Sequence, residues 1–172
     1  MDPLIPNGQP APDFSLPDLA GSLHRLSDQR GRLAIASFWS AECPWSERVD
    51  HILLSYLPDW GERVALLSIA SNDNEEPELL ARVARERGLP LVLHDAGHRV
   101  ADLYGAQATP HLFVVDASGI LRYQGALDDV TFRQREPTQH YLLQAVEALL
   151  AGRLPDPAQT IPYGCALVRY DP

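Results

Sequence analysis

Cysteine is scarce in this chain of 172 residues, which contains only Cys43 and Cys165. Two cysteines cannot build the several disulfides of a small secreted scaffold. They are also too few for a structural zinc site unless histidines contribute. The six histidines show no metal-ligand spacing beside either cysteine; they are His24, His51, His94, His98, His111 and His140. We therefore expect no metal site.

Basic residues are also few. The chain has 14 basic against 23 acidic residues and a net charge of −9, which argues against nucleic acid or an anionic membrane as a partner. No apolar run approaches the roughly 18 residues that span a bilayer. The first ten residues, MDPLIPNGQP, lack a basic region followed by an apolar one. We expect a cytoplasmic protein with one domain over residues 1–172.

Short apolar runs alternate with helical patterns along the chain. The runs LAIASFW and VALLSIA predict buried strands, and HLFVVD and ILRYQG flank a turn that predicts an antiparallel hairpin. Pro58 is expected to stop the helix that begins at Pro44. The expected strands are 33–39, 64–70, 89–94, 111–116 and 120–125, with short edge strands around 18–21, and the expected helices are 44–57, 75–87, 97–104 and 138–151. This order predicts an α/β fold, a mixed sheet with helices on both faces.

Cys43 stands between the first buried strand and the helix that follows it, in FWSAECPWSERV. A thiol at a helix N-terminus faces free backbone N–H groups and the positive end of the helix dipole. Both favour the thiolate and can lower its pKa from about 8.5 into the range of roughly 3.5–7.5. The Ser46 hydroxyl, one turn along, is placed to donate a hydrogen bond to the sulfur, whereas Glu42 and Glu47 oppose the thiolate. We expect a moderately lowered pKa; the alternative is an inert, buried cysteine.

Four stretches together resemble the redoxin branch of the thioredoxin-like superfamily, which includes the alkyl-hydroperoxide-reductase/thiol-specific-antioxidant proteins. They are GQPAPDFSLPDLAG with LSDQRG, LAIASFWSAECPWS, ATPHLFVVDASGILRYQG and LLAGRLPDPAQTIPYGCALV. The last resembles the closing helix and Gly-Cys tail of a bacterial single-domain subgroup. The resemblance implies a thioredoxin-like fold, a central mixed β-sheet with residues 1–30 as an N-terminal redoxin extension and 153–172 as a tail packed on it.

The sequence departs from both enzyme types that it resembles. A thioredoxin would read Cys-x-x-Cys, but Ser46 replaces the second cysteine. A peroxiredoxin would usually read Pro-x-x-x-Thr/Ser-x-x-Cys; Ser40 fits this pattern, but Ala36 stands where the proline belongs. Neither pattern is complete.

The Thr109-Pro110 step precedes the hairpin, where the resemblance implies a cis proline beside the active cysteine and a loop that can pair with an extended substrate. Trp39, Trp45 and Pro110 would then border a shallow apolar groove, although for Trp39 a place in the core is favoured. The expected substrate-binding residues are Trp39, Ser40, Pro44, Trp45, Thr109 and Pro110.

Cys165 lies far from Cys43 along the chain, but the cost of closing a loop grows slowly with its length. The two can pair if the tail brings their Cα atoms within about 7 Å. The alternatives are a small apolar residue on an added strand, an intermolecular disulfide or a regulatory thiol. The candidate catalytic residues are thus Cys43, Ser46 and Cys165. The charged residues of the second helix are instead expected to form a solvated face: Glu75, Glu76, Glu78, Arg82, Arg85, Glu86 and Arg87.

These observations favour a thiol–disulfide oxidoreductase with antioxidant chemistry. The Cys43 thiolate would attack a disulfide or an oxidant, and Cys165, a small thiol or a partner protein would resolve the product. No bound cofactor is required; the expected partners are a disulfide-bearing protein, a small thiol or a peroxide, and a dithiol or glutathione-type reductant. The alternatives are a thiol peroxidase, supported by Ser40, and a binding module without turnover, supported by the missing second cysteine. A metallochaperone ranks lowest.

Overall fold

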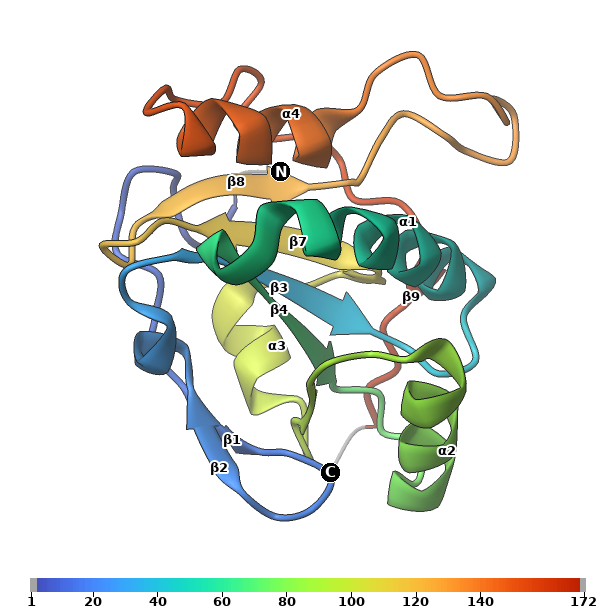
Figure 1. Ribbon diagram of the computed structural model, residues 1–172. Helices are drawn as coiled ribbons and strands as arrows, with labels where there is room; N and C mark the ends of the chain where they lie inside the picture. The colour runs from blue at the N-terminus through green and yellow to red at the C-terminus, as the bar shows by residue number, and fades with distance from the viewer. Residues whose placement is uncertain (1–2, 171–172) are drawn as a thin grey trace.

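The structure, a computed structural model, describes residues 3–170, and a five-stranded mixed sheet forms its centre (Figure 1). The strand order is β5-β4-β3-β7-β8. The pairs β3–β4 and β4–β5 are parallel, and the pairs β3–β7 and β7–β8 are antiparallel. The strands span Leu33–Trp39 (β3), Val64–Ala70 (β4), Val92–His94 (β5), His111–Val115 (β7) and Leu121–Gly125 (β8). The predicted thioredoxin-like α/β architecture is confirmed.

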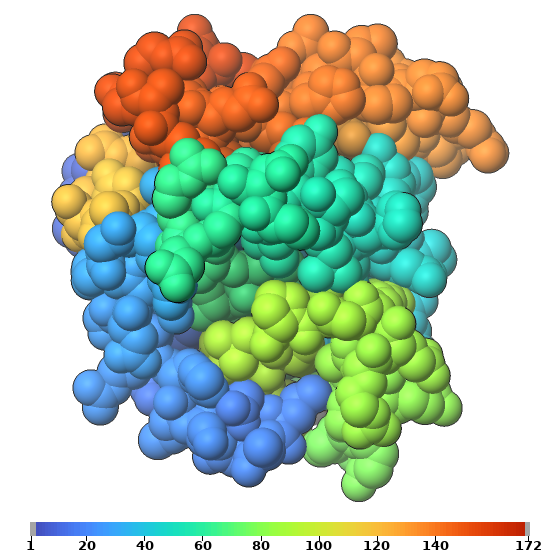
Figure 2. All heavy atoms as spheres, in the orientation of Figure 1, coloured from blue at the N-terminus to red at the C-terminus, as the bar shows by residue number. Residues whose placement is uncertain are grey.

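Helices cover both faces of the sheet because alternate residues of β3 point to opposite sides. Ile35 packs with α1 (Pro44–Trp60) and α4 (Tyr141–Leu150). On the opposite face, Phe38 packs with α3 (Arg99–Tyr104) and with Phe14 and Leu16 of the N-terminal segment. Trp39 packs with α2 (Pro77–Arg87) at the carboxyl end of the strand. Figure 2 shows the face on which α1 and α2 lie.

The first helix extends further than the sequence predicted. It runs through Pro58 to Trp60. Proline removes a backbone donor, but in the last turn this loss is small against the packing of Trp60, which is buried and stacks on Tyr56 with ring centroids 5.5 Å apart. Gly61 then ends the helix, its N–H bonding to the Leu57 carbonyl.

The other helices begin later than predicted, each for a local reason. Glu76 is extended because it precedes Pro77. Gly97 and His98 both have positive φ, so α3 begins after them. His140 has a non-helical backbone, with φ −105° and ψ 69°, so α4 begins after it. The strand predicted at 89–94 is also shorter than expected, because β5 begins at Val92.

Two small pairs of strands lie outside the central sheet. β1 (Ser15–Pro17) and β2 (Leu23–Arg25) form the predicted edge strands around the turn at 18–21. β6 (Ala108–Thr109) pairs antiparallel with β9 (Cys165–Ala166) of the tail, which returns beside the start of α1 (Figure 1). Two 3₁₀ turns complete the elements, η1 (Leu26–Gln29) and η2 (Gly61–Arg63). Within residues 3–170, no helix is long and apolar enough to cross a bilayer.

Candidate functional site

Cys43 caps the N-terminus of α1, directly after β3 and a short turn. Pro44 takes the first helical position, where its missing N–H costs no hydrogen bond. Cys43 is only 2 % exposed. The strand and the helix thus fix the sulfur at the carboxyl end of β3, beneath the surface.

The Thr109-Pro110 bond is cis, as predicted, and lies against this cysteine. The Cys43 thiol donates a hydrogen bond to the Thr109 carbonyl, with an Sγ–O distance of 3.0 Å. The Thr109 hydroxyl is buried and has no other hydrogen-bond partner among the described residues; it faces the sulfur and helps to lower its pKa. The carbonyl and the hydroxyl of Thr109 are therefore both directed at Cys43.

The tail places Cys165 opposite Thr109 in the register of β6 and β9. Gly164 makes this approach possible, because a Cβ at this position would lie 2.2 Å from the Thr109 carbonyl oxygen. The thiol and the backbone N–H of Cys165 face the Cys43 sulfur, and both cysteines are free thiols. The structure thus brings the two cysteines together at the Thr-Pro loop.

The two thiols have opposite pKa shifts. Burial raises the pKa of Cys43, but hydrogen bonds from the Cys165 thiol, the backbone N–H groups of Ser46 and Cys165 and the Thr109 hydroxyl outweigh it, so the pKa falls below its ordinary value. Burial and the neighbouring Cys43 raise the pKa of Cys165 to about 12, with a further contribution from Glu75. Of the two thiols, Cys43 is therefore the one that ionises more readily.

Ser46 supports the site differently from the prediction. Its hydroxyl accepts a hydrogen bond from the Ser40 N–H at 3.2 Å and so closes the turn before Cys43. The group that faces the sulfur is the Ser46 backbone N–H, because the first-turn N–H groups of a helix point toward its cap. The Ser46 side chain thus organises the turn.

Glu75 is a site residue that the sequence did not identify. It is 5 % exposed, contrary to the predicted solvated face. Its Oε2 atom accepts hydrogen bonds from the Ser40 hydroxyl at 2.9 Å and the Glu42 N–H at 3.0 Å. Asn72, three residues earlier, donates to Oε1 at 3.4 Å and accepts from the Val168 N–H at 2.8 Å. The loop after β4 therefore connects the turn of Cys43 with the tail.

Arg87 is the second exception to the predicted solvated face. Its guanidinium bonds to Asp50 at 2.9 Å and to the Ala41 carbonyl at 2.7 Å, and it lies 5.5 Å from the Trp39 ring centroid. Trp39 is fully buried and donates to Asp50 at 2.6 Å. The prediction that Trp39 lies in the core is confirmed, and the prediction that it borders a groove is wrong.

The remaining expected groove residues lie on both sides of the tail. Trp45 packs edge-on against Tyr163 with ring centroids 4.8 Å apart. These two residues and Pro110 line a recess whose free volume is only about 10 Å³, while Pro44 is exposed at the helix start. The tail side chain therefore fills the apolar groove that was expected beside Cys43.

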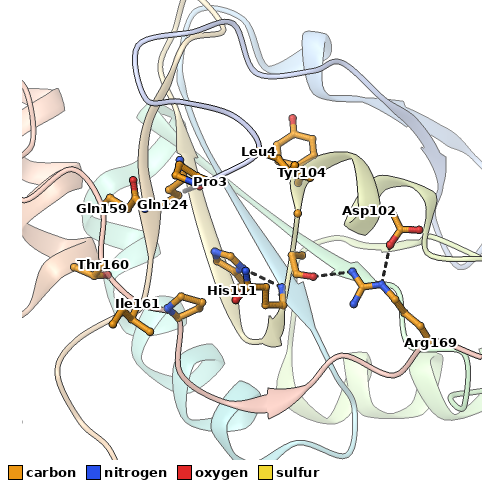
Figure 3. Close-up of a pocket in the computed structure, with 14 residues that line it drawn as sticks. Pro3, Leu4, Asp102, Tyr104, His111, Gln124, Gln159, Thr160, Ile161 and Arg169 are labelled. Atoms are coloured by element: carbon orange, nitrogen blue, oxygen red, sulfur yellow. Dashed lines mark hydrogen bonds and ion pairs between the residues drawn. The ribbon is translucent and has the colours of Figure 1, made fainter. Parts of the chain in front are cut away.

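A larger cavity, of about 890 Å³, lies beyond the Thr-Pro loop (Figure 3). His111 lines it and is buried, which lowers its pKa to about 4, and Arg169 spans from Asp102 to the Ala106 carbonyl at its edge. Neither cysteine lines this cavity. In the described part of the chain, no three His, Cys, Asp or Glu side chains are grouped closely enough to hold a metal ion.

Known proteins resemble this chain in both sequence and structure. Residues 7–124 match the AhpC/TSA family. The thiol-disulfide oxidoreductase ResA of Geobacillus thermodenitrificans is 32% identical over 114 residues, which cover 65% of this chain and 64% of the relative. The thiol:disulfide interchange protein DsbE of Allochromatium vinosum is 31% identical over 121 residues, covering 67% and 64%. The matches thus span less than two thirds of these relatives' own length.

Two solved structures match nearly the whole chain. The hypothetical protein SMc02350 of Sinorhizobium meliloti has a TM-score of 0.88 and 30% identity, with coverage of 98% of this chain and 97% of its own. An uncharacterized conserved protein of Geobacillus kaustophilus also has a TM-score of 0.88 and 30% identity, with coverage of 100% and 96%. The fold and the match over residues 7–124 lead to one conclusion: the chain belongs to the AhpC/TSA family.

Proposed function

We propose that this protein is a thiol–disulfide oxidoreductase whose redox pair is Cys43 and Cys165. The observation that carries the proposal is the pairing of β6 with β9, which sets Cys165 opposite Thr109 while the Cys43 thiol bonds to the Thr109 carbonyl. Two relatives are named as a thiol-disulfide oxidoreductase and a thiol:disulfide interchange protein. In this chain, a cysteine of the tail takes the role that a second cysteine at position 46 would have.

Cys43 performs the first step because only a thiolate is an effective nucleophile toward sulfur or oxygen. Its lowered pKa, from hydrogen bonds that outweigh burial, makes it the reactive sulfur of the pair. Attack on a disulfide gives a mixed disulfide at Cys43 and releases the other half as a thiolate. The Thr109 hydroxyl and the Ser46 N–H at the helix N-terminus favour the thiolate during this step.

Cys165 performs the second step. While Cys43 is a thiolate, its charge keeps the pKa of Cys165 high. Once Cys43 is covalently bound, that charge is gone, and Cys165 ionises more readily. Cys165 then attacks the Cys43 sulfur and forms the internal disulfide. The bound group leaves, takes up the proton that Cys165 has lost, and is released as a thiol. A dithiol or glutathione-type reductant returns the pair to the reduced state.

The two alternative functions receive less support. Ser40 was the residue that favoured a peroxidase, but its hydroxyl donates to Glu75 rather than facing Cys43. A binding module without turnover would not need a lowered pKa at Cys43 or a second thiol directed at it. A redox cycle uses both features.

Turnover of a small disulfide tests the proposal directly. With dithiothreitol as reductant and bis(2-hydroxyethyl) disulfide as substrate, the wild type should turn over. Cys43→Ser should be inactive. In the absence of dithiothreitol, Cys165→Ser should accumulate a mixed disulfide at Cys43, seen as an added substrate half by intact mass. Undiminished turnover in Cys43→Ser would refute the assigned nucleophile.

A further inference from the structure

We propose that the docked tail restricts Cys43 to two-electron oxidants of low molecular weight, such as a hydroperoxide or a small disulfide, and excludes disulfides held in a folded protein. This inference rests on the proposed function and names its substrate class. It follows from what occupies the space around the sulfur.

The first observation is that the backbone edge beside Cys43 is already paired. A strand edge with free N–H and C=O groups is where an extended polypeptide adds to a sheet. At Thr109 that edge is taken by Cys165 of β9. Gly164 lies so close to the Thr109 carbonyl that no Cβ fits between them. A protein segment carrying a disulfide cannot pair there while the tail is docked.

The second observation is that side chains close the remaining space. Tyr163 packs on Trp45 and leaves the recess beside Pro110 nearly without free volume. The Tyr163 hydroxyl accepts a hydrogen bond from the Phe132 N–H at 3.0 Å, which ties it to the loop after β8. With Cys43 at 2 % exposure, only a small molecule can approach the sulfur without displacing the tail.

The third observation is that the tail is also held beyond Cys165. Beyond β9, the Val168 N–H bonds to Asn72 at 2.8 Å, and its carbonyl accepts from the Asp73 N–H at 3.1 Å. Leu167 is buried in the core of the sheet. Arg169 then forms a 2.7 Å ion pair with Asp102. Undocking has to break several of these contacts together, so it is a minor population.

The chemistry requires only a small electrophile. For an oxidant X–Y, either HO–OH or RS–SR, the Cys43 thiolate takes X and releases Y⁻. The Cys165 thiol then attacks Cys43 and releases HX, leaving the Cys43–Cys165 disulfide. The pair loses two electrons and X–Y gains them, with the single thiol proton leaving in HX. Since Cys165 is already adjacent, neither step needs the tail to leave.

The test compares oxidants of different size on the full chain. Reduced protein is mixed with hydrogen peroxide, with bis(2-hydroxyethyl) disulfide or with insulin, and internal disulfide formation is followed by quenching and intact mass. We expect insulin to react at least about 100-fold more slowly than the small disulfide, because it has to wait for tail opening. The two small oxidants show which bond, O–O or S–S, is preferred.

Two variants separate access from reactivity. Gly164→Ala pushes the tail away from Thr109. It should lower the ratio of the oxidation rate with the small disulfide to that with insulin by about tenfold. Ala166→Ser, at an exposed position on β9, should leave this ratio of rates unchanged. If Gly164→Ala does not fold, Cys165→Ser leaves one thiol in the chain, and its alkylation by N-ethylmaleimide should far exceed that by a polyethylene-glycol maleimide.

The possible failures are distinct. Equal rates with insulin and the small disulfide, or equal alkylation by the small and large reagents, would overturn the size restriction and leave the proposed redox pair intact. An unchanged ratio of rates in a folded Gly164→Ala variant would also overturn the size restriction. If no oxidant gives a Cys43–Cys165 disulfide, the proposed function itself fails.

Discussion

The buried pair of Arg87 and Asp50 offers a quantitative test of how the turn before Cys43 is supported. Arg87 reaches from the end of α2 to the Asp50 carboxylate on α1 and to the Ala41 carbonyl in the turn. The side chains of Arg87 and Asp50 are 12% and 3% exposed. Arg87→Met removes the charge and both hydrogen bonds while keeping much of the apolar stem. Asp50 is then left buried without its cation.

The expected loss follows from the cost of an uncompensated buried charge. Removing one partner of a buried ion pair costs about 3–5 kcal/mol, and the partial exposure of Arg87 places this variant near the lower end. Burial raises the pKa of Asp50 to about 6, even with Trp39 and Arg87 donating to it. An aspartate whose folded pKa exceeds its unfolded value of about 3.9 stabilises most below that value and loses this contribution as the pH rises through about 6.

Arg87→Met raises the pKa of Asp50 further, so the loss of stability should be larger at about pH 8 than at about pH 5. Urea unfolding followed by tryptophan fluorescence measures the free energy of unfolding at both values. The matched control is Asp50→Asn combined with Arg87→Met, which removes the charge yet keeps an acceptor for Trp39. It should recover part of the loss at the higher pH. An equal loss at both pH values, or no recovery in the double variant, would refute the reasoning.

Three further outcomes are expected. Cys165→Ala removes the thiol that hydrogen-bonds to Cys43 and should raise the pKa of Cys43, measured by the ultraviolet absorbance of the thiolate; an unchanged titration would contradict this. Thr109→Val removes the buried hydroxyl and should raise the same pKa by less, because this hydrogen bond contributes less. Leu53→Ala, at a fully buried position between α1 and the sheet, should lower the free energy of unfolding by about 2–5 kcal/mol. If urea unfolding gives a loss below about 1 kcal/mol, the surrounding side chains fill the cavity and the expected cost is wrong.

Local patterns were sufficient to predict the sheet and the position of Cys43. The runs at 33–39 and 64–70 became β3 and β4 with the same bounds, because buried parallel strands are continuous apolar segments. Pro44 predicted the start of α1 correctly. The end of α1 was wrong because the burial of Trp60 depends on contacts across the fold rather than on the local effect of Pro58.

The surroundings of Cys43 depend on long-range contacts that no local pattern shows. β9 has only two residues, and its register against Thr109 depends on the close approach of Gly164. Glu75 stands among several charged residues that read as an exposed helix face, but it precedes α2 and turns inward to Ser40. The Gly-Cys pair in the tail was the available signal for the first feature, and nothing in the sequence distinguished Glu75 from its neighbours.

The central claim is that Cys43 and Cys165 form one redox pair. Its most direct test is the intact mass and peptide map of the reduced protein after one equivalent of hydrogen peroxide, with no added thiol. Loss of two hydrogens from a monomer, with a peptide linking Cys43 to Cys165, is the predicted result. Gain of oxygen on Cys43 alone, with Cys165 still free, would contradict the claim.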